Sequence, residues 1–459
     1  MDQALIPQPP ASSALSFWHA TAGDLTPRAG LDGDTEADVA IVGGGLTGLW
    51  TAWYLLEREP ALRIVVLEKE IAGFGASGRN GGWLSALFPR STASLERTHG
   101  RDAALAMRRA MIGTIAEVAC VTESMGLDVD LTRAGTVAYA RSAVQERAAR
   151  AELAEAAHYG VDELSWLGAD EVGAAGALGA TFDRNCASVH PARLVRGLAT
   201  VLESRGVRLF EGTEVTAVSP GRVETRRGAV TTDRIVLATE GYTATFRATH
   251  RRILPLYSLM IATEPLSAEF WESTRLGRGQ TFTDYRHLLI YGQRTADDRF
   301  AFGGRGARYH WGSAIRAGYD RVPRVFDHLR RTLVELFPGA AEAAVSHRWG
   351  GPLGVPRDWH ASVGYDPATR IGRAGGYVGD GLSTTNLAGR TLADLLTGAD
   401  TELTRLPWVG HRSPDWEPEP LRFLGANAGM LAMAAADAEE RVTRRGSVIA
   451  KVMGPLVGH

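Results

Sequence analysis

Three glycines and one glutamate have the types and spacing of a dinucleotide-binding site. Gly43, Gly45 and Gly48 follow the apolar run 39–42, and Glu68 lies 20 residues after Gly48, at the end of a second apolar run. In such a site the first glycine allows a tight turn, the second lets the backbone approach a pyrophosphate, and the third lets a helix pack closely on a strand. The carboxylate binds the ribose hydroxyls. The spacing therefore predicts that the chain binds a dinucleotide.

These residues need a strand, a turn, a helix and a second strand to position them. We predict strands over 38–42 and 63–67 and a helix over 46–58. The free N–H groups at the start of that helix would face the pyrophosphate. The predicted contacts in this unit are Gly43, Gly45, Leu46, Thr47, Gly48, Glu68 and Lys69.

A glycine-rich segment over 71–83 follows the second predicted strand. It also matches the spaced-glycine pattern, but it opens onto polar residues instead of an apolar helix, so we interpret it as a loop. Many glycines allow a backbone to press against a flat ligand. A solvent-exposed flexible loop is the alternative. The predicted ligand contacts in this loop are Gly75, Ala76, Ser77, Arg79, Asn80, Gly81 and Gly82.

The motif Gly-Ala-Ser-Gly-Arg-Asn-Gly-Gly in this loop resembles the flavin-covering loop of the D-amino acid oxidase superfamily, and is most similar to its γ-glutamylputrescine oxidase branch. A Gly-x-Gly turn at 379–381, followed by Leu-Ala-Gly-Arg at 387–390, looks like the family's closing motif. The resemblance covers about residues 36–400 and implies that the dinucleotide is FAD. It implies further FAD contacts at Val215, Ala238, Thr239, Gly241, Gly379, Gly381, Leu382, Ser383 and Thr384.

The expected fold class is α/β, with a Rossmann-like FAD-binding domain of the glutathione-reductase βαβ type and a second α+β substrate domain built on an antiparallel sheet. The resemblance implies that the two domains alternate along the chain. We expect the FAD-binding domain over 36–90, 187–248 and 348–400, and the substrate domain over 91–186 and 249–347. An extended arm over 1–35, pinned by Phe17 and Trp18, and a helical arm over 401–459 complete the chain. The segment 376–396 is predicted as strand, glycine turn and helix, and 421–440 as a helix. The tail over 441–459 mixes basic and apolar residues, which favours a helix that packs or forms oligomers, with a membrane-surface role as the alternative.

The resemblance implies oxidation of a C–N bond. Flavin would take a hydride from the carbon next to nitrogen, and the resulting imine would hydrolyse. Oxygen, giving peroxide, or another acceptor would reoxidise the flavin. The pocket should disfavour the ammonium form through desolvation or nearby positive charge, so no obligatory acid–base residue is required. The pocket candidates are Arg79, His287, Tyr291, Arg305 and Trp349.

Three of these candidates have a structural alternative. Arg79 could contact only the flavin, His287 could be an ordinary surface residue, and Trp349 could pack beneath the flavin. Arg305 separates two substrate classes, because a pocket arginine favours a carboxylate or phosphonate. A pocket without one favours a plain amine or polyamine derivative.

Composition excludes several other classes of function. A net charge of −2 gives no basic surface for nucleic acid. The two cysteines, Cys120 and Cys186, form no disulfide framework, which fits a cytoplasmic location. No metal-ligand spacing is present, so no metal is expected. Sarcosine oxidases carry a flavin-linked cysteine in the region matching 290–350, which has none here, so we expect non-covalent FAD.

Three functions remain in view. The first is a cytoplasmic FAD-dependent amine or amino-acid oxidase, with a small-molecule substrate and no membrane contact. The second is a dehydrogenase that passes electrons to a quinone or a partner protein at a membrane. The third is a flavin-binding protein without turnover. The amount of peroxide formed, and reduction of the flavin by an amine, distinguish them.

Overall fold

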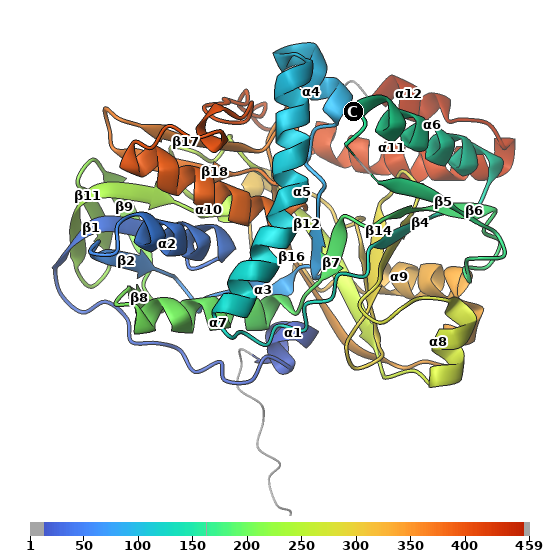
Figure 1. The fold of residues 1–459 in the computed structure, drawn as a ribbon, viewed down its shortest axis with the longest axis horizontal. Helices are drawn as coiled ribbons and strands as arrows, with labels where there is room; N and C mark the ends of the chain where they lie inside the picture. Colours follow the sequence, from blue (N-terminus) through green and yellow to red (C-terminus); the bar gives the residue numbers. More distant parts are fainter. Residues whose placement is uncertain (1–12, 162, 454–459) are drawn as a thin grey trace, which may run out of the picture.

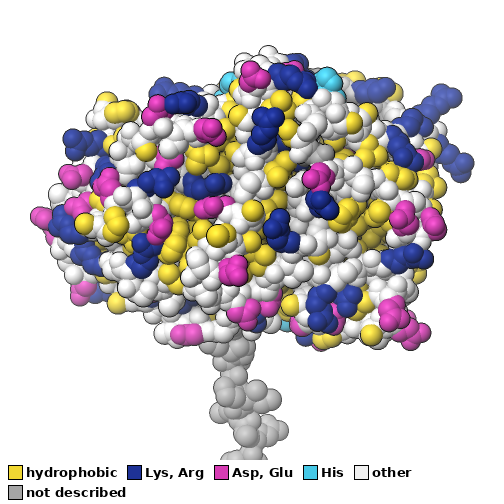
Figure 2. Space-filling view, viewed as in Figure 1, with side chains coloured by type: hydrophobic (Ala, Val, Ile, Leu, Met, Phe, Trp, Pro, Cys, Tyr) yellow, Lys and Arg dark blue, Asp and Glu magenta, His cyan; other side chains and the backbone are white. Residues whose placement is uncertain are grey.

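The computed structural model describes residues 13–161 and 163–453 (Figure 1). Two large sheets lie side by side, and the long helix α5 (Arg101–Ser124) runs between them in this view (Figure 1). Acidic and basic side chains are intermixed on the face shown in Figure 2, in keeping with the net charge near zero. No described helix combines the length and apolar character needed to span a membrane.

The first sheet consists mainly of parallel strands. Its strands lie in the order β17-β18-β11-β1-β2-β8, and a hairpin of β9 and β10 continues from β11. The apolar runs predicted as strands form β1 and β2, and every residue of β2 is buried, as in a strand packed on both faces. The strands are β1 (Thr35–Val42), β2 (Ile64–Leu67), β8 (Arg208–Phe210), β9 (Val215–Ser219), β10 (Arg222–Thr225), β11 (Ala229–Leu237), β17 (Ser362–Asp366) and β18 (Ile371–Gly375).

Helices from distant parts of the chain share one apolar core with this sheet. α2 (Leu46–Arg58) packs against α10 (Gly381–Thr397), and α5 packs against α10. Met107 and Met111 of α5 are buried in this core, so α5 belongs with the first sheet and not with the substrate domain predicted over 91–186. The other helices here are α3 (Ala76–Arg79), α4 (Thr92–His99) and α7 (Pro191–Ser204), with the 3₁₀ turns η2 (Glu240–Thr245) and η5 (Leu403–Arg405).

The second sheet is antiparallel except where β13 and β4 pair in parallel. Its order is β16-β12-β15-β14-β13-β4-β6-β5. β16 pairs with β12 along its whole length, so the domain boundary predicted at residue 348 falls inside a strand and is wrong. The strands are β4 (Thr136–Ala140), β5 (Leu164–Gly168), β6 (Gly179–Asp183), β12 (Leu254–Thr263), β13 (Thr281–Asp284), β14 (Ile290–Arg294), β15 (Phe300–Gly304) and β16 (Val345–Val355).

A cluster of phenylalanines forms the core of the second domain. Phe282, Phe300 and Phe337 are buried with ring centroids 5.1–5.7 Å apart. The helices that belong here are α6 (Ala143–Tyr159), α8 (Ala268–Thr274) and α9 (Pro323–Leu336), with η3 (Trp311–Ser313) and η4 (Pro338–Ala340). A small sheet of β3 (Trp83–Ser85) and β7 (Cys186–Ser188) lies where the chain passes between the domains.

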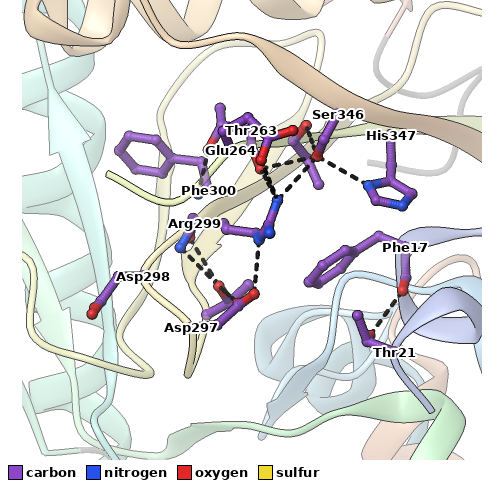
Figure 3. Close-up of polar contacts among 12 residues, drawn as sticks. Phe17, Thr21, Thr263, Glu264, Asp297, Asp298, Arg299, Phe300, Ser346 and His347 are labelled. Atoms are coloured by element: carbon purple, nitrogen blue, oxygen red, sulfur yellow. Dashed lines mark hydrogen bonds and ion pairs between the residues drawn. The ribbon is translucent and has the colours of Figure 1, made fainter. Parts of the chain in front are cut away.

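The N-terminal segment is pinned to the body by its aromatic residues. η1 (Ser13–Leu15) leads into α1 (Phe17–Ala20), in which Phe17 and Trp18 are buried. The Trp18 indole N–H donates to the Asn80 carbonyl oxygen at 2.8 Å. The Arg299 guanidinium lies 5.7 Å from the centroid of the Phe17 ring and donates to Asp297 and to the Thr263 carbonyl oxygen (Figure 3). The segment therefore joins the glycine-rich loop to the second sheet.

His19 makes the stability of this segment depend on pH. Burial, and then the charge of Arg79, lower its pKa from 6.5 to about 4. Between these two pH values the unfolded chain binds a proton that the folded chain does not, so the free energy of unfolding falls as the pH is lowered. The shift corresponds to about 3 kcal/mol.

When the pH is lowered from 7 to 4.5, the free energy of unfolding should fall in both proteins. We expect this fall to be about 2–3 kcal/mol smaller in His19→Gln than in wild type, because glutamine takes up no proton. Measuring the free energy of unfolding of both proteins at these pH values tests this expectation. Parallel pH curves for the two would contradict it.

The C-terminal arm predicted over 401–459 is helical from Leu421 onward, whereas 401–420 contain only the short turn η5, and 454–459 lie outside the described residues. α11 (Leu421–Thr443) is followed by α12 (Val448–Met453). The Asp437 carboxylate on α11 accepts from the backbone N–H groups of His287 and Leu288 at 2.7 and 2.9 Å. α11 thereby holds the loop between β13 and β14.

Candidate active site

The predicted glycine turn joins β1 to α2. Gly43 has φ +113°, and a Cβ there would lie 2.5 Å from the Ala238 carbonyl oxygen on the neighbouring chain segment. A Cβ at Gly48 would lie 2.2 Å from the Gly43 carbonyl oxygen, so α2 packs tightly on the turn. Gly45 is the N-cap and has no side chain to satisfy the first N–H groups of α2. The turn therefore has the form that an anion-binding helix start needs.

Glu68 follows β2 and faces this turn. Its carboxylate accepts from the Gly44 and Glu70 N–H groups at 2.7 and 2.9 Å. Burial raises its pKa to about 7, and these two hydrogen bonds act against that rise. The carboxylate is thus held by backbone donors at the place predicted to bind ribose.

The glycine-rich loop carries α3 and borders the same space. The Ser77 hydroxyl accepts from the Leu46 N–H at 2.9 Å and so links the loop to the start of α2. The Arg79 guanidinium donates to Asp320 Oδ2 and the Gly350 carbonyl oxygen at 3.0 Å, and to the Tyr242 hydroxyl at 3.1 Å. Because protein groups already occupy so many of its donors, Arg79 serves to hold the loop more than to bind a substrate.

The start of α10 faces the cavity from the opposite side. The strand predicted at the start of the segment 376–396 is misplaced, since β18 ends at Gly375 and residues 376–380 form the turn before α10. Asp380 is the N-cap but its side chain makes no capping hydrogen bond, so the first N–H groups of the helix remain available to a ligand. Burial raises the pKa of Asp380 to about 6, and the charge of Arg305 opposes this rise.

These elements enclose one large cavity of ≈ 1490 Å³. This exceeds the roughly 300–1,000 Å³ of usual small-molecule sites and leaves room for a dinucleotide together with a substrate. It extends from Val215 at the edge of the first sheet to Tyr291 and Arg305 on the second. The predicted cofactor contacts that line it are Gly43, Gly45, Leu46, Thr47, Glu68, Lys69, Gly75, Ala76, Ser77, Arg79, Asn80, Gly81, Val215, Ala238, Thr239, Gly241, Gly379, Gly381 and Leu382.

Four predicted contacts lie behind this lining. Gly48 packs under the turn, and Gly82 lies against Gln293 and Val189. Ser383 and Thr384 are buried in α10, where their hydroxyls donate to the carbonyl oxygens of Ser85 and Asp380. These four support the walls of the cavity and do not face its interior.

Arg305 lies in the cavity wall formed by the second sheet. One of its N–H groups donates to the Val378 carbonyl oxygen at 2.9 Å, and the guanidinium lies 5.2 Å from the centroid of the Trp359 ring. Its side chain has no ion pair within residues 13–161 and 163–453. Burial lowers its pKa, and the charge of Asp380 acts in the opposite direction. A cation held in this way is ready to pair with an anion that enters the cavity.

The other pocket candidates divide into two groups. Tyr291 lines the cavity, and its hydroxyl lies 2.7 Å from Ser258 Oγ. His287 also lines it, but its Nε2 lies 3.0 Å from Glu440 Oε1 and is engaged by α11. Trp349 does not line it: the indole is 2% exposed and donates to the Arg79 carbonyl oxygen at 2.9 Å, so it packs beneath the loop. Its prediction as a pocket residue is wrong.

The structure adds cavity residues that were not among the five pocket candidates. Tyr257 of β12 is 3% exposed and lines the cavity, and its hydroxyl makes no hydrogen bond of normal geometry to the described residues. Trp359 lies in the turn before β17 with φ +57°. Glu240 follows β11, and burial raises its pKa to about 7. Met433 reaches the cavity from α11. Of these residues only Glu240 is adjacent in sequence to predicted contacts, Thr239 and Gly241, so its position in the sequence was the only available signal.

Comparison with known proteins assigns the chain to a family. The family described as DAO, FAD dependent oxidoreductase, matches residues 38–395. The chain belongs to this family. It is an FAD-dependent oxidoreductase, and the predicted fold class and cofactor are confirmed.

Individual DAO proteins resemble the chain over most of its length. Gamma-glutamylputrescine oxidoreductase of Escherichia coli (strain K12) is 30% identical over 415 residues, which cover 87% of this chain and 94% of that protein. The probable oxidoreductase OrdL of Rhizobium meliloti (strain 1021) is 29% identical over 413 residues, covering 87% and 92%. The crystal structure of glycine oxidase from Geobacillus kaustophilus shares the fold, with a TM-score of 0.66 at 22% identity over 82% of this chain and 99% of that chain.

The residues of this DAO site fit FAD. The turn at Gly43 excludes a side chain, the start of α10 has no side-chain cap, and the cavity is large enough for the cofactor and a substrate. Neither cysteine lines the cavity: Cys120 is exposed, and the thiol of Cys186 lies 3.3 Å from Thr281 Oγ1. The described residues hold no group of three or more His, Cys, Asp or Glu side chains placed to bind a metal.

Proposed function

We propose that this chain oxidises the C–N bond of a small amine that also carries an anionic group such as a carboxylate. The observation that carries this proposal is the Arg305 guanidinium, which faces the cavity with no ion pair in the described part of the chain. The names of gamma-glutamylputrescine oxidoreductase and glycine oxidase support the same substrate class, because γ-glutamylputrescine and glycine each contain an amine and a carboxylate. Bound FAD supplies the acceptor for a hydride from the carbon next to nitrogen.

The protein contributes binding, orientation and electrostatics. The glycine turn, Glu68, the loop over 75–81 and the start of α10 would hold FAD. Arg305 would pair with the anionic group and so orient the substrate. Because the aromatic walls of the cavity exclude water, the charged ammonium form is disfavoured and the amine is kept neutral. This arrangement requires no dedicated base.

We further propose that FAD is held without a covalent bond and that the electrons leave to oxygen or to a separate acceptor. The position of both cysteines away from the cavity supports the first point. A dehydrogenase that delivers electrons to a quinone or partner protein is the alternative for the second. The two differ in whether peroxide accompanies product.

The reaction is tested by turnover with two matched sets of amines. One set carries a carboxylate, such as glycine, N-methylglycine and γ-glutamylputrescine, and the other consists of plain polyamines. We expect a carbonyl product only from members of the first set. One peroxide per carbonyl identifies oxygen as the acceptor, whereas product that needs an added redox dye identifies a dehydrogenase. Carbonyl product from plain polyamines alone would overturn the proposed substrate class, and no product from either set would overturn the proposed reaction.

A further inference from the structure

The outer face of α11 carries an unbroken apolar stripe. Its residues recur at alternating intervals of three and four, and all are exposed. The exposed fractions of the larger ones are 61% for Leu421, 60% for Leu424, 71% for Leu431 and 84% for Val442. The outer stripe of α11 consists of Leu421, Leu424, Ala428, Leu431, Ala435, Ala438 and Val442.

This spacing is that of a helix–helix seam. Apolar residues spaced three and four apart over three heptads occupy the a and d positions of a coiled coil, where they face a second helix. A helix that packs on its own protein needs a different face for that contact. α11 has one, because Arg422, Gly429 and Ala436 on the opposite side are buried. The outer stripe of α11 is therefore a second apolar face that nothing within the described chain covers.

The helix is fixed in place, so the stripe is a preformed surface. Asp437 binds the backbone of His287 and Leu288, and Glu440 contacts the His287 ring. Near the N-terminal end, the Trp311 ring is 58% exposed and lies 5.6 Å from the Phe423 ring, which widens the apolar surface. Four of the ten exposed large hydrophobic residues of the described chain lie on this one stripe.

The area is sufficient for association of two chains. A helix of 23 residues is about 35 Å long and about 10–12 Å wide. The projected area of one of its faces is therefore about 400 Å². Together with Trp311 and α12, two such faces bury on the order of 1,000 Å², which is the lower limit for a specific interface. A face that is apolar throughout is complementary to a copy of itself, as a two-fold dimer requires.

A membrane surface fits the stripe less well. Helices that lie on membranes have a broad apolar face bordered by lysine and arginine. The positions beside this stripe are Gly425, Ala432 and Glu439 on one edge and Asn427, Ala434 and Arg441 on the other, so only one of the six is basic. We propose that two copies of this chain form a two-fold dimer through the outer stripe of α11.

The test is the mass of the intact, FAD-loaded protein in solution, measured by light scattering from the low micromolar to the hundred-micromolar range. We expect wild type to reach twice the mass of one chain, and Leu424→Glu and Leu431→Glu to remain at the mass of one chain. Leu178→Glu is the matched control, because Leu178 is an exposed leucine (46%) that is not part of α11, and it should still dimerise. Flavin absorbance confirms that each variant is folded.

Three outcomes would overturn the proposal. One is a wild type that stays at the mass of one chain throughout this range. Another is a dimer that survives both stripe variants with its dissociation constant unchanged. The last is a monomeric wild type that binds vesicles of phosphatidylserine and phosphatidylcholine and loses this binding in Leu431→Glu, which would assign the stripe to a membrane.

Discussion

Gly43→Ala is expected to give a folded but colourless protein that no longer retains FAD. Gly43 has φ +113°, and the new Cβ would lie 2.5 Å from the Ala238 carbonyl oxygen. The backbone strain alone costs about 1–3 kcal/mol, and relief of the contact must move the turn that faces the cofactor. A combined loss of about 3 kcal/mol weakens FAD binding roughly a hundredfold. Visible absorbance after purification, followed by titration with FAD, measures this loss.

Gly113→Ala is the matched control for this substitution. Gly113 lies inside α5 and is not part of the cavity lining, and a Cβ added there would meet no described atom within 4 Å apart from the backbone of its own helix. The control should keep its FAD and gain slightly in stability, because alanine is the better helix former. Full retention of FAD by Gly43→Ala would mean that the turn does not hold the cofactor.

Arg305→Ala is expected to raise KM about a hundredfold for amines that carry a carboxylate. Hydrogen bonds to charged groups contribute about 1.5–3 kcal/mol, and the upper figure corresponds to about two factors of ten. An amine without an anionic group should show no such change, because it has nothing to pair with the guanidinium. Arg305→Lys should fall between wild type and Arg305→Ala, since lysine keeps the charge but loses the planar fork.

Arg348→Ala provides the control for loss of a positive charge. Arg348 is an exposed residue of β16 outside the cavity lining, so its removal should leave KM unchanged for both kinds of amine. FAD content should equal that of wild type in all three variants. An unchanged KM for carboxylate-bearing amines in Arg305→Ala would remove Arg305 from the binding site.

The residues at the cofactor end of the cavity could be predicted from the sequence, because the contacts they make depend on residues that are close together in the chain. Gly43, Gly45 and Glu68 belong to one strand–helix–strand unit, in which the turn leaves no room for a side chain. Residue types and short spacings therefore carry most of the information. The same holds for the start of α10, where two glycines flank Asp380.

The substrate end was less accessible because its residues come together only through tertiary contacts. Tyr257, Trp359 and Met433 belong to a strand, a turn and a terminal helix that are distant in sequence, and no local pattern links them. Trp349 shows a related difficulty. Alternation along β16 places it on one face of the strand, but only pairing with Met260 on β12 decides which face that is.

The local sequence pattern also could not assign α5 and β16 to the correct domain. The apolar spacing of α5 predicts a helix with a buried face, yet it does not say which of the two sheets that face contacts. β16 likewise continues past the predicted boundary, because its partner β12 extends alongside it to Val355. Both errors concern long-range packing and leave the assignment of the cofactor site unaffected.

Anaerobic bleaching of the flavin tests the central claim most directly. The purified yellow protein is freed of oxygen, and its visible absorbance is followed while single amines are added. We predict that an amine carrying a carboxylate bleaches the visible flavin bands at least as fast as the enzyme turns over. A plain polyamine of similar length should leave these bands unchanged. Bleaching by polyamines alone, or a yellow protein that no amine of either kind bleaches, would contradict the account.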